Sequence, residues 1–135
     1  MTITAAQVQA GLAAALKKAG ELKSPSSIAI VDAGRNLLGF LRMEDALLAS
    51  IEISQAKAYT ARSLNMKTAD IMPLVQPGGP LFGMEHSHRT QPLVVFGGGV
   101  PITKDGAVIG AVGVAGGTTD DDAAIAEVAA AAIAG

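Results

Sequence analysis

The sequence predicts an α+β fold in which helices pack on a mainly antiparallel sheet. Apolar residues recur at helical spacing near both ends and in the middle of the chain, and short apolar runs of strand length lie between those stretches. Turn residues at 32–36 and 105–106 join neighbouring strands as hairpins, so these strand pairs run antiparallel. Because the 135 residues show no repeat and no linker, we expect one domain over residues 1–135.

Local signals support the individual elements. Thr4 and Gln7 have the spacing of a capping box, and Thr68 can cap a short helix. After the first strand, we expect Asp32 to accept hydrogen bonds from the amides of its turn. In chain order, the predicted elements are a helix between Thr4 and Gly20, strands over 28–31 and 37–42, a helix over 48–64, a short helix from 68, strands over 93–96, 100–104 and 107–114, and a last helix.

The last helix follows a glycine-rich segment and begins with threonines and acids. Thr118 or Thr119 provides its cap, and residues 120–122, all aspartates, complement its positive N-terminus. The same carboxylates would repel a bound phosphate, and neither glycine-rich segment has the spacing of a P-loop or a dinucleotide fingerprint. We therefore expect no nucleotide at this turn.

The composition excludes several classes of function. The net charge is −2 and the basic residues form no run, so neither nucleic acid nor an anionic membrane surface is an expected partner. The chain has no cysteine, which removes disulfides, thiol catalysis and thiolate metal sites. No apolar run approaches the roughly 20 residues of a membrane span, and the first residues lack the pattern of a signal peptide. We expect a cytoplasmic protein.

The same composition predicts self-association. Half of the residues are apolar, but aromatic residues make up only 3% and charged residues only 16%. Monomeric proteins seldom expose large apolar patches, so a chain of this kind is expected to bury apolar surface against copies of itself.

Residues 76–101 form the stretch that we expect to carry the function. They contain both histidines and two of the three phenylalanines, and residues 76–92 show no periodicity. Long ordered loops in compact domains are usually functional. A Ser-His-Asp hydrolase is not indicated, because no G-x-S-x-G elbow accompanies Ser87.

His86 and His88 are the candidate metal or haem-iron ligands. In an extended segment, both imidazoles would face the same side, and Glu85 could add an oxygen ligand. Zinc normally takes three or four protein ligands, whereas haem needs one or two axial ligands and an apolar slot. Haem therefore suits this loop better, in a slot at a subunit interface. The apolar residues of that slot are Leu81, Phe82 and Met84.

Lys57 is the other unusual residue. It lies four residues from both Ile53 and Ala61, on or beside the buried stripe of the predicted middle helix. Its ammonium can reach water while its stem is buried, which the sequence alone favours. The alternative is that it pairs with a carboxylate of a ligand.

Six fragments, in order along the chain, together resemble the GlcG/HbpS-type haem-binding family, which includes the C-terminal domain of PduO-type proteins. They are IAIVDAG at 28–34, RM at 42–43, AKAYTA at 56–61, QPGGPLFG at 76–83, FGGGVPI at 96–102 and IGAVGVAGGT at 109–118. The resemblance implies a five-stranded antiparallel sheet flanked by helices, profilin-like in outline. It also implies assembly into dimers and octamers, and binding of haem or a corrinoid.

This sequence matches the family's motifs at some positions and differs from them at others. Its motif positions include Arg42, Lys57, Phe96, Gly98, Gly99 and Pro101. Ala115 stands where many relatives have serine, and the first predicted helix contains no histidine that could serve as an axial ligand.

Three hypotheses follow. In the first, the chain is a homo-oligomeric small-molecule-binding protein for haem or a related tetrapyrrole, with His86 or His88 on the iron. The ligand-binding set is then Arg42, Lys57, Phe82, Met84, His86, His88, Phe96, Gly98, Gly99 and Pro101.

In the second hypothesis, the chain is an enzyme or accessory factor for a small carboxylate or carbonyl metabolite. Lys57, Arg42 and Glu52 then orient it, and His86 or His88 is the acid/base. In the third, it is a structural oligomer without ligand.

Overall fold

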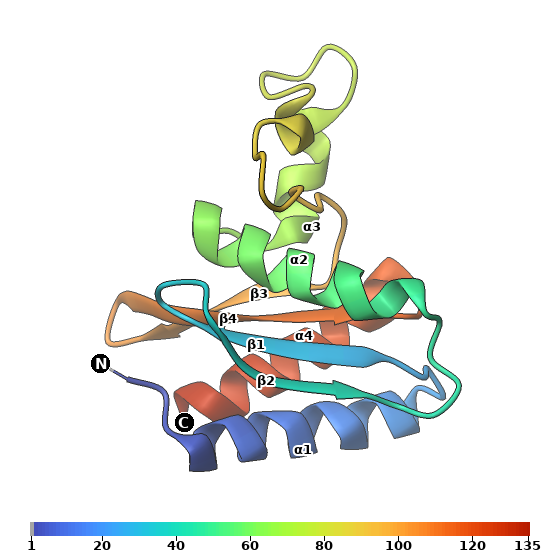
Figure 1. The fold of residues 1–135 in the computed structure, drawn as a ribbon, viewed down its shortest axis with the longest axis vertical. Coiled ribbons are helices and arrows are strands. Elements are labelled where there is room, and N and C mark those ends of the chain that lie inside the picture. The colour runs from blue at the N-terminus through green and yellow to red at the C-terminus, as the bar shows by residue number, and fades with distance from the viewer. Residues whose placement is uncertain (1) are drawn as a thin grey trace.

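A computed structural model describes residues 2–135 and shows a sheet between two layers of helices, with an arm projecting beyond one layer (Figure 1). The elements are α1 (Ala5–Glu21), β1 (Ser27–Asp32), β2 (Leu37–Arg42), α2 (Ala49–Leu64), α3 (Thr68–Ile71), η1 (Met72–Val75), η2 (Met84–His86), β3 (Gly99–Lys104), β4 (Ala107–Ala115) and α4 (Thr119–Ala134). The predicted α+β class and the antiparallel sheet are confirmed.

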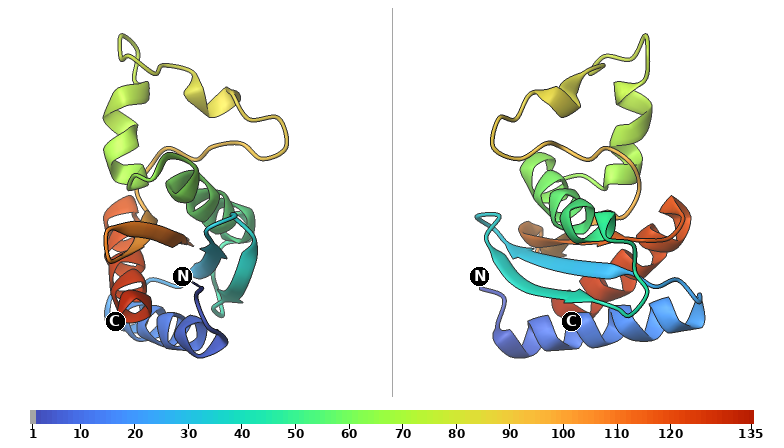
Figure 2. Two further views of the ribbon diagram at one scale, coloured as in Figure 1. Left: turned by 90° about the vertical axis from the view of Figure 1, so that its left-hand side faces the viewer. Right: turned by 45° about the vertical axis from the view of Figure 1, so that its right-hand side comes forward.

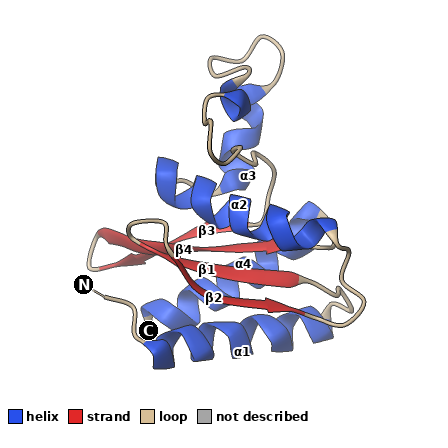
Figure 3. Cartoon of the chain, in the orientation of Figure 1, coloured by secondary structure: helices blue, strands red, loops and turns tan. Residues whose placement is uncertain are grey.

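The sheet has four strands in the order β2-β1-β4-β3, and the expectation of five strands was wrong. The missing strand is the segment 93–96, which is drawn as loop in Figure 3. Its Val94 amide donates a hydrogen bond of 3.0 Å to the Thr60 hydroxyl on α2. Because this amide bonds to a helix side chain, the segment lies against α2 and adds no fifth strand.

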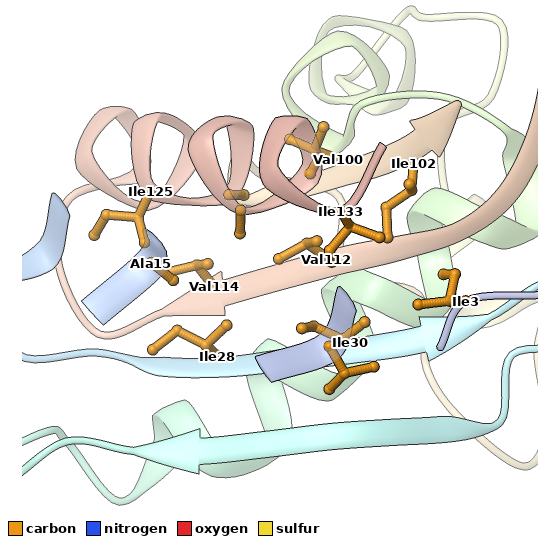
Figure 4. Packing of buried hydrophobic residues seen from close by; sticks show 14 of the residues in the cluster. Ile3, Ala15, Ile28, Ile30, Val100, Ile102, Val112, Val114, Ile125 and Ile133 are labelled. Atoms are coloured by element: carbon orange, nitrogen blue, oxygen red, sulfur yellow. The ribbon is translucent and has the colours of Figure 1, made fainter. Parts of the chain in front are cut away.

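The two faces of the sheet are packed differently. On one face, α1 and α4 cover the larger apolar side chains, including Ile28, Ile30, Val112 and Val114 (Figure 4). On the other face, α2 packs on small residues such as Ala29 and Ala111. The small residues allow α2 to lie close to the sheet, which brings the α2 side chains to the ends of β4 and β3.

The arm consists of α3, η1, η2 and the loops around them, and it extends away from the sheet in both views of Figure 2. Leu81 and Phe82 lie on it with exposed side chains, and Phe82 is 66% exposed. Two of the three apolar residues of the predicted slot are therefore on the surface of the single chain, and the third, Met84, is half-buried.

Several local predictions are confirmed and one is wrong. Thr4 and Gln7 form the capping box, the Asp32 carboxylate accepts from the turn amides of Gly34 and Asn36, and Thr118 caps α4. Thr68 does not cap α3. Its hydroxyl instead accepts a hydrogen bond of 2.8 Å from the buried amide of Gly99. Within residues 2–135, no helix is long and apolar enough to cross a bilayer.

Candidate functional site

Lys57 and Asp122 form a buried ion pair where the sheet ends. Lys57 Nζ lies 3.1 Å from Asp122 Oδ2 and donates a second hydrogen bond, of 2.8 Å, to the Val114 carbonyl oxygen. The lysine is 1% exposed and the aspartate 2%. Neither sequence interpretation of Lys57 describes this arrangement, because its ammonium reaches neither water nor a ligand carboxylate but a carboxylate of the same chain.

Each member of the pair is placed by the apolar stripe of its helix. On α2, Lys57 is buried together with Ser54, Ala58 and Ala61. On α4, Asp122 starts a stripe that continues through Ile125, Ala126 and Ala129. Asp122 Oδ1 also accepts from the Gly117 amide at 3.1 Å, which fixes the carboxylate at the start of α4.

Burial and pairing act on the Lys57 ammonium in opposite directions. Burial disfavours the charged form and lowers the pKa of Lys57 below 10.5, while the Asp122 carboxylate opposes this shift. The ring of Phe96 lies 5.0 Å from Nζ and adds a cation–π contact. The net effect is a lowered pKa, so the neutral amine of Lys57 forms at a lower pH than that of a surface lysine.

Two glycines of the predicted set leave space for Lys57, because a side chain at either position would clash with it. A Cβ on Gly98 would lie 2.6 Å from Lys57 Nζ, and a Cβ on Gly99 would lie 2.6 Å from the Lys57 carbonyl oxygen. Gly98 also has a φ of +131°, which L side chains rarely adopt. These glycines let the backbone of residues 97–99 pass directly beside the lysine.

A small pocket opens beside the ion pair. It has a volume of about 140 Å³, and its polar wall contains the buried Ser50, Lys57 and Asp122. Leu47 and Phe96 are its exposed apolar covers, and Phe96 is 38% exposed. Ile53 separates it from a larger open groove of about 400 Å³, lined by Glu52, Ile53, Gln55, Ala56, Thr90, Gln91, Pro92 and Val94.

The histidines lie elsewhere. His86 ends the short helix η2 and is exposed, and His88 packs edge-on against Tyr59 with ring centroids 5.8 Å apart. Tyr59 and Lys57 are two residues apart on α2, about 200° around the helix axis. The structure therefore does not bring His88 and Lys57 into one site.

The remaining predicted site residues are dispersed. Arg42 is exposed at the end of the edge strand β2 and makes no ion pair within residues 2–135. Pro101 lines a shallow hollow between β3 and α4, beside the exposed Lys67–Glu127 pair. Of the ten ligand-binding candidates, Lys57 and Phe96 share the small pocket, and Gly98 and Gly99 border it. Four others belong to the arm and the loop that follows it: Phe82, Met84, His86 and His88.

The arm carries residue types that one side of a haem contacts. Among residues 2–135, no group of three His, Cys, Asp or Glu side chains could hold a metal ion. The exposed His86 is close in sequence to the exposed Leu81 and Phe82, which gives an imidazole and apolar side chains without a closed cavity. Glu85 Oε1 is buried and has no hydrogen-bond partner in this part of the chain, so a donor from outside the chain fits here.

Asp122 is the site residue that sequence reasoning missed. The three aspartates were assigned together to the N-terminus of the helix, although only the third lies on the apolar stripe. A charge on the buried stripe of one helix requires a counter-charge, and Asp122 is the acid that occupies the matching position on another helix. The need for a counter-charge was therefore the available signal, and it points to an acid on another helix without singling out one of the three aspartates.

Comparison with known proteins gives a consistent set of relatives. A family model described as "Haem degrading protein HbpS-like" matches residues 3–131. An uncharacterized 15.0 kDa protein of Citrobacter freundii, from the dhaT–dhaS intergenic region, is 44% identical over 128 residues, which is 95% of this chain and 89% of the relative.

Two further relatives concern PduO. The corrinoid adenosyltransferase PduO of Citrobacter freundii is 42% identical over 120 residues, which is 89% of this chain. The match covers only 36% of PduO, so this chain spans about a third of that enzyme. A crystal structure of the PduOC:haem complex has a TM-score of 0.92 and 38% identity, covering 98% of this chain and 96% of that one.

Proposed function

The chain belongs to the HbpS-like family, and from that premise we propose that it is a haem-binding protein that works as a homo-oligomer. The observation that carries the proposal is the likeness to the haem complex of PduOC, which extends over nearly the whole chain. The family and fold therefore support a tetrapyrrole as the ligand. A cytoplasmic location is part of the same proposal.

We place the haem against the arm, between two copies of the chain. His86 and the neighbouring Leu81 and Phe82 would form one side, and a second copy would cover the other. The exposed apolar side chains and the orphaned Glu85 Oε1 support an outside partner at this segment. A bound haem supplies an iron that takes one or two axial ligands, and His86 or His88 has the donor chemistry for that position.

Lys57 has a different role in this proposal from the one expected. Its charge is already compensated by Asp122, so it does not serve as the counter-ion of a haem propionate. Arg42 is an exposed cation and remains available to a carboxylate.

The proposal is tested by titrating haemin into the purified chain and recording the Soret band. We expect a saturable shift that is weakened in His86→Ala or His88→Ala and lost in the double variant, whereas the exposed Thr103→Ala on β3 serves as a matched control. Light scattering during the titration measures the oligomeric state. A wild type without a saturable shift, or a double variant that behaves like the wild type, contradicts this ligation.

A further inference from the structure

The Lys57–Asp122 pair borders an opening, although an ion pair that only joins two helices needs none. The adjoining pocket of about 140 Å³ has three buried polar side chains on its wall and apolar covers that remain partly exposed. At ~30 Å³ for each water-sized group, it has room for a molecule of about four or five heavy atoms. A buried lysine beside a carboxylate in such a cleft is a candidate functional site.

The charges of the pocket select the kind of molecule. Lys57 and Asp122 are the only charged side chains of its lining, and they neutralise each other. An anion would therefore meet no uncompensated cation, and a cation would meet no uncompensated carboxylate. A small uncharged molecule with an apolar tail fits instead, because Leu47, Ile53 and Phe96 supply apolar contacts.

The pair also supplies an amine and a proton acceptor 3.1 Å apart. The Val114 carbonyl oxygen holds Nζ in place at 2.8 Å, and burial favours the neutral amine, which is the nucleophilic form of lysine. We propose that this pocket binds a small uncharged aldehyde or ketone, which condenses with the Lys57 amine to form an imine. The proposal is independent of haem binding, since it uses neither the arm nor the histidines.

The condensation balances within the pair. The Asp122 carboxylate takes a proton from the ammonium, the nitrogen lone pair forms the C–N bond, and the carbonyl π electrons move to oxygen. The oxygen next takes a proton from the newly bonded nitrogen, which leaves a neutral carbinolamine. Asp122 then returns its proton to the carbinolamine hydroxyl, water leaves, and the nitrogen lone pair forms the C=N bond. The product is a protonated imine, so Asp122 keeps its positive partner and the ion pair survives the reaction.

The test is reductive trapping on the full chain with propanal and sodium cyanoborohydride, which converts an imine to a stable secondary amine. Peptide mass spectrometry then gives the labelling rate of each lysine. We expect Lys57 to be labelled about tenfold faster than the exposed Lys17 and Lys67, as befits a desolvated amine. Glyoxylate, which carries a carboxylate, should lose this preference for Lys57.

Two variants show whether the pocket delivers the aldehyde. Ala49→Leu and Thr119→Leu each add bulk to the wall of the pocket without removing either member of the pair. Each should reduce labelling of Lys57 about tenfold and leave labelling of Lys67 unchanged, and either variant suffices if the other fails to fold. Labelling of Lys57 that is no faster than that of the surface lysines, or that is unchanged in the folded variants, overturns the proposal.

Discussion

Lys57 on α2 and Asp122 on α4 meet at the C-terminal end of β4, with Nζ 3.1 Å from Oδ2 and both side chains buried. The two helices lie on opposite faces of the sheet (Figure 1), so this pair links the two helical layers directly. It does so at the point where the backbone of residues 97–99 passes, which explains why two glycines are needed there.

The pair should behave as a coupled unit in unfolding experiments. Lys57→Met leaves a buried carboxylate without its counter-charge and should cost about 3–5 kcal/mol of the free energy of unfolding. Lys57→Met combined with Asp122→Asn should cost less than the sum of the two single changes, by about 1–3 kcal/mol, because the second change removes the unpaired charge. Urea unfolding at pH 7 measures both quantities.

The exposed pair Lys67–Glu127 provides the matched control for that cycle. Its atoms are 2.6 Å apart, but the two side chains are 50% and 47% exposed. Solvent screening limits such pairs to about 1 kcal/mol or less, so Lys67→Met and Glu127→Gln should have small effects. Equal coupling in the two cycles would contradict the view that burial makes the Lys57–Asp122 pair important.

The pKa of Lys57 gives stability a pH dependence of defined sign. Burial lowers this pKa in the folded chain below 10.5, so between the folded pKa and 10.5 the unfolded state binds more protons. Relative to Lys57→Met, the wild type should therefore gain stability as the pH rises through that window and lose it as the pH falls. NMR titration of ¹³Cε-labelled lysine checks the cause, and a Lys57 that titrates with the surface lysines contradicts it.

Lys57 also shows which features of the site could be predicted from the sequence and which could not. Helical spacing alone placed it on or beside a buried stripe, because such spacing is a local property of the chain. Its partner lies 65 residues away, and the sequence could not show which of three adjacent aspartates turns inward without the position of α4. The hairpins, the capping box and most helix bounds were predictable because they depend on nearby residues, as does the position of Lys57 relative to the stripe.

The two errors in the fold have one physical origin. The segment 93–96 has the composition of a strand, and Thr68 has that of a helix cap, yet both form hydrogen bonds with distant partners. Tertiary hydrogen bonds decided these two cases, and no local pattern reports them. His86 lies in the short helix η2, so the extended segment that would align its ring with that of His88 is not formed.

Gly113 should tolerate no side chain. A Cβ there would meet the Ser54 carbonyl oxygen and the Ala58 amide of α2, so the helix would have to move away from the sheet. Gly113→Ala is expected to cost about 1–3 kcal/mol through overpacking. Gly20→Ala is the control, since no atom lies within 4 Å of its added Cβ, and it should be neutral or stabilise α1 by up to about 1 kcal/mol. Thermal unfolding of both variants separates these outcomes.

Thr60 holds the segment 93–96 against α2. Its hydroxyl accepts from the Val94 amide at 3.0 Å and donates to the Ala56 carbonyl oxygen at 2.7 Å. Thr60→Val keeps the shape of the side chain but removes the acceptor, so the Val94 amide loses its partner at a cost of about 1–3 kcal/mol.

Hydrogen exchange measured by NMR should show the loss locally. In Thr60→Val, the Val94 amide should exchange about 5- to 150-fold faster, because about 1.4 kcal/mol corresponds to a factor of ten in the opening equilibrium, while the amides of β4 change little. Thr68→Val should produce the matching effect at the Gly99 amide and leave Val94 unaffected. If the Val94 amide exchanges at the wild-type rate in Thr60→Val, its hydrogen bond to Thr60 does not hold this segment, and the absence of the fifth strand needs another cause.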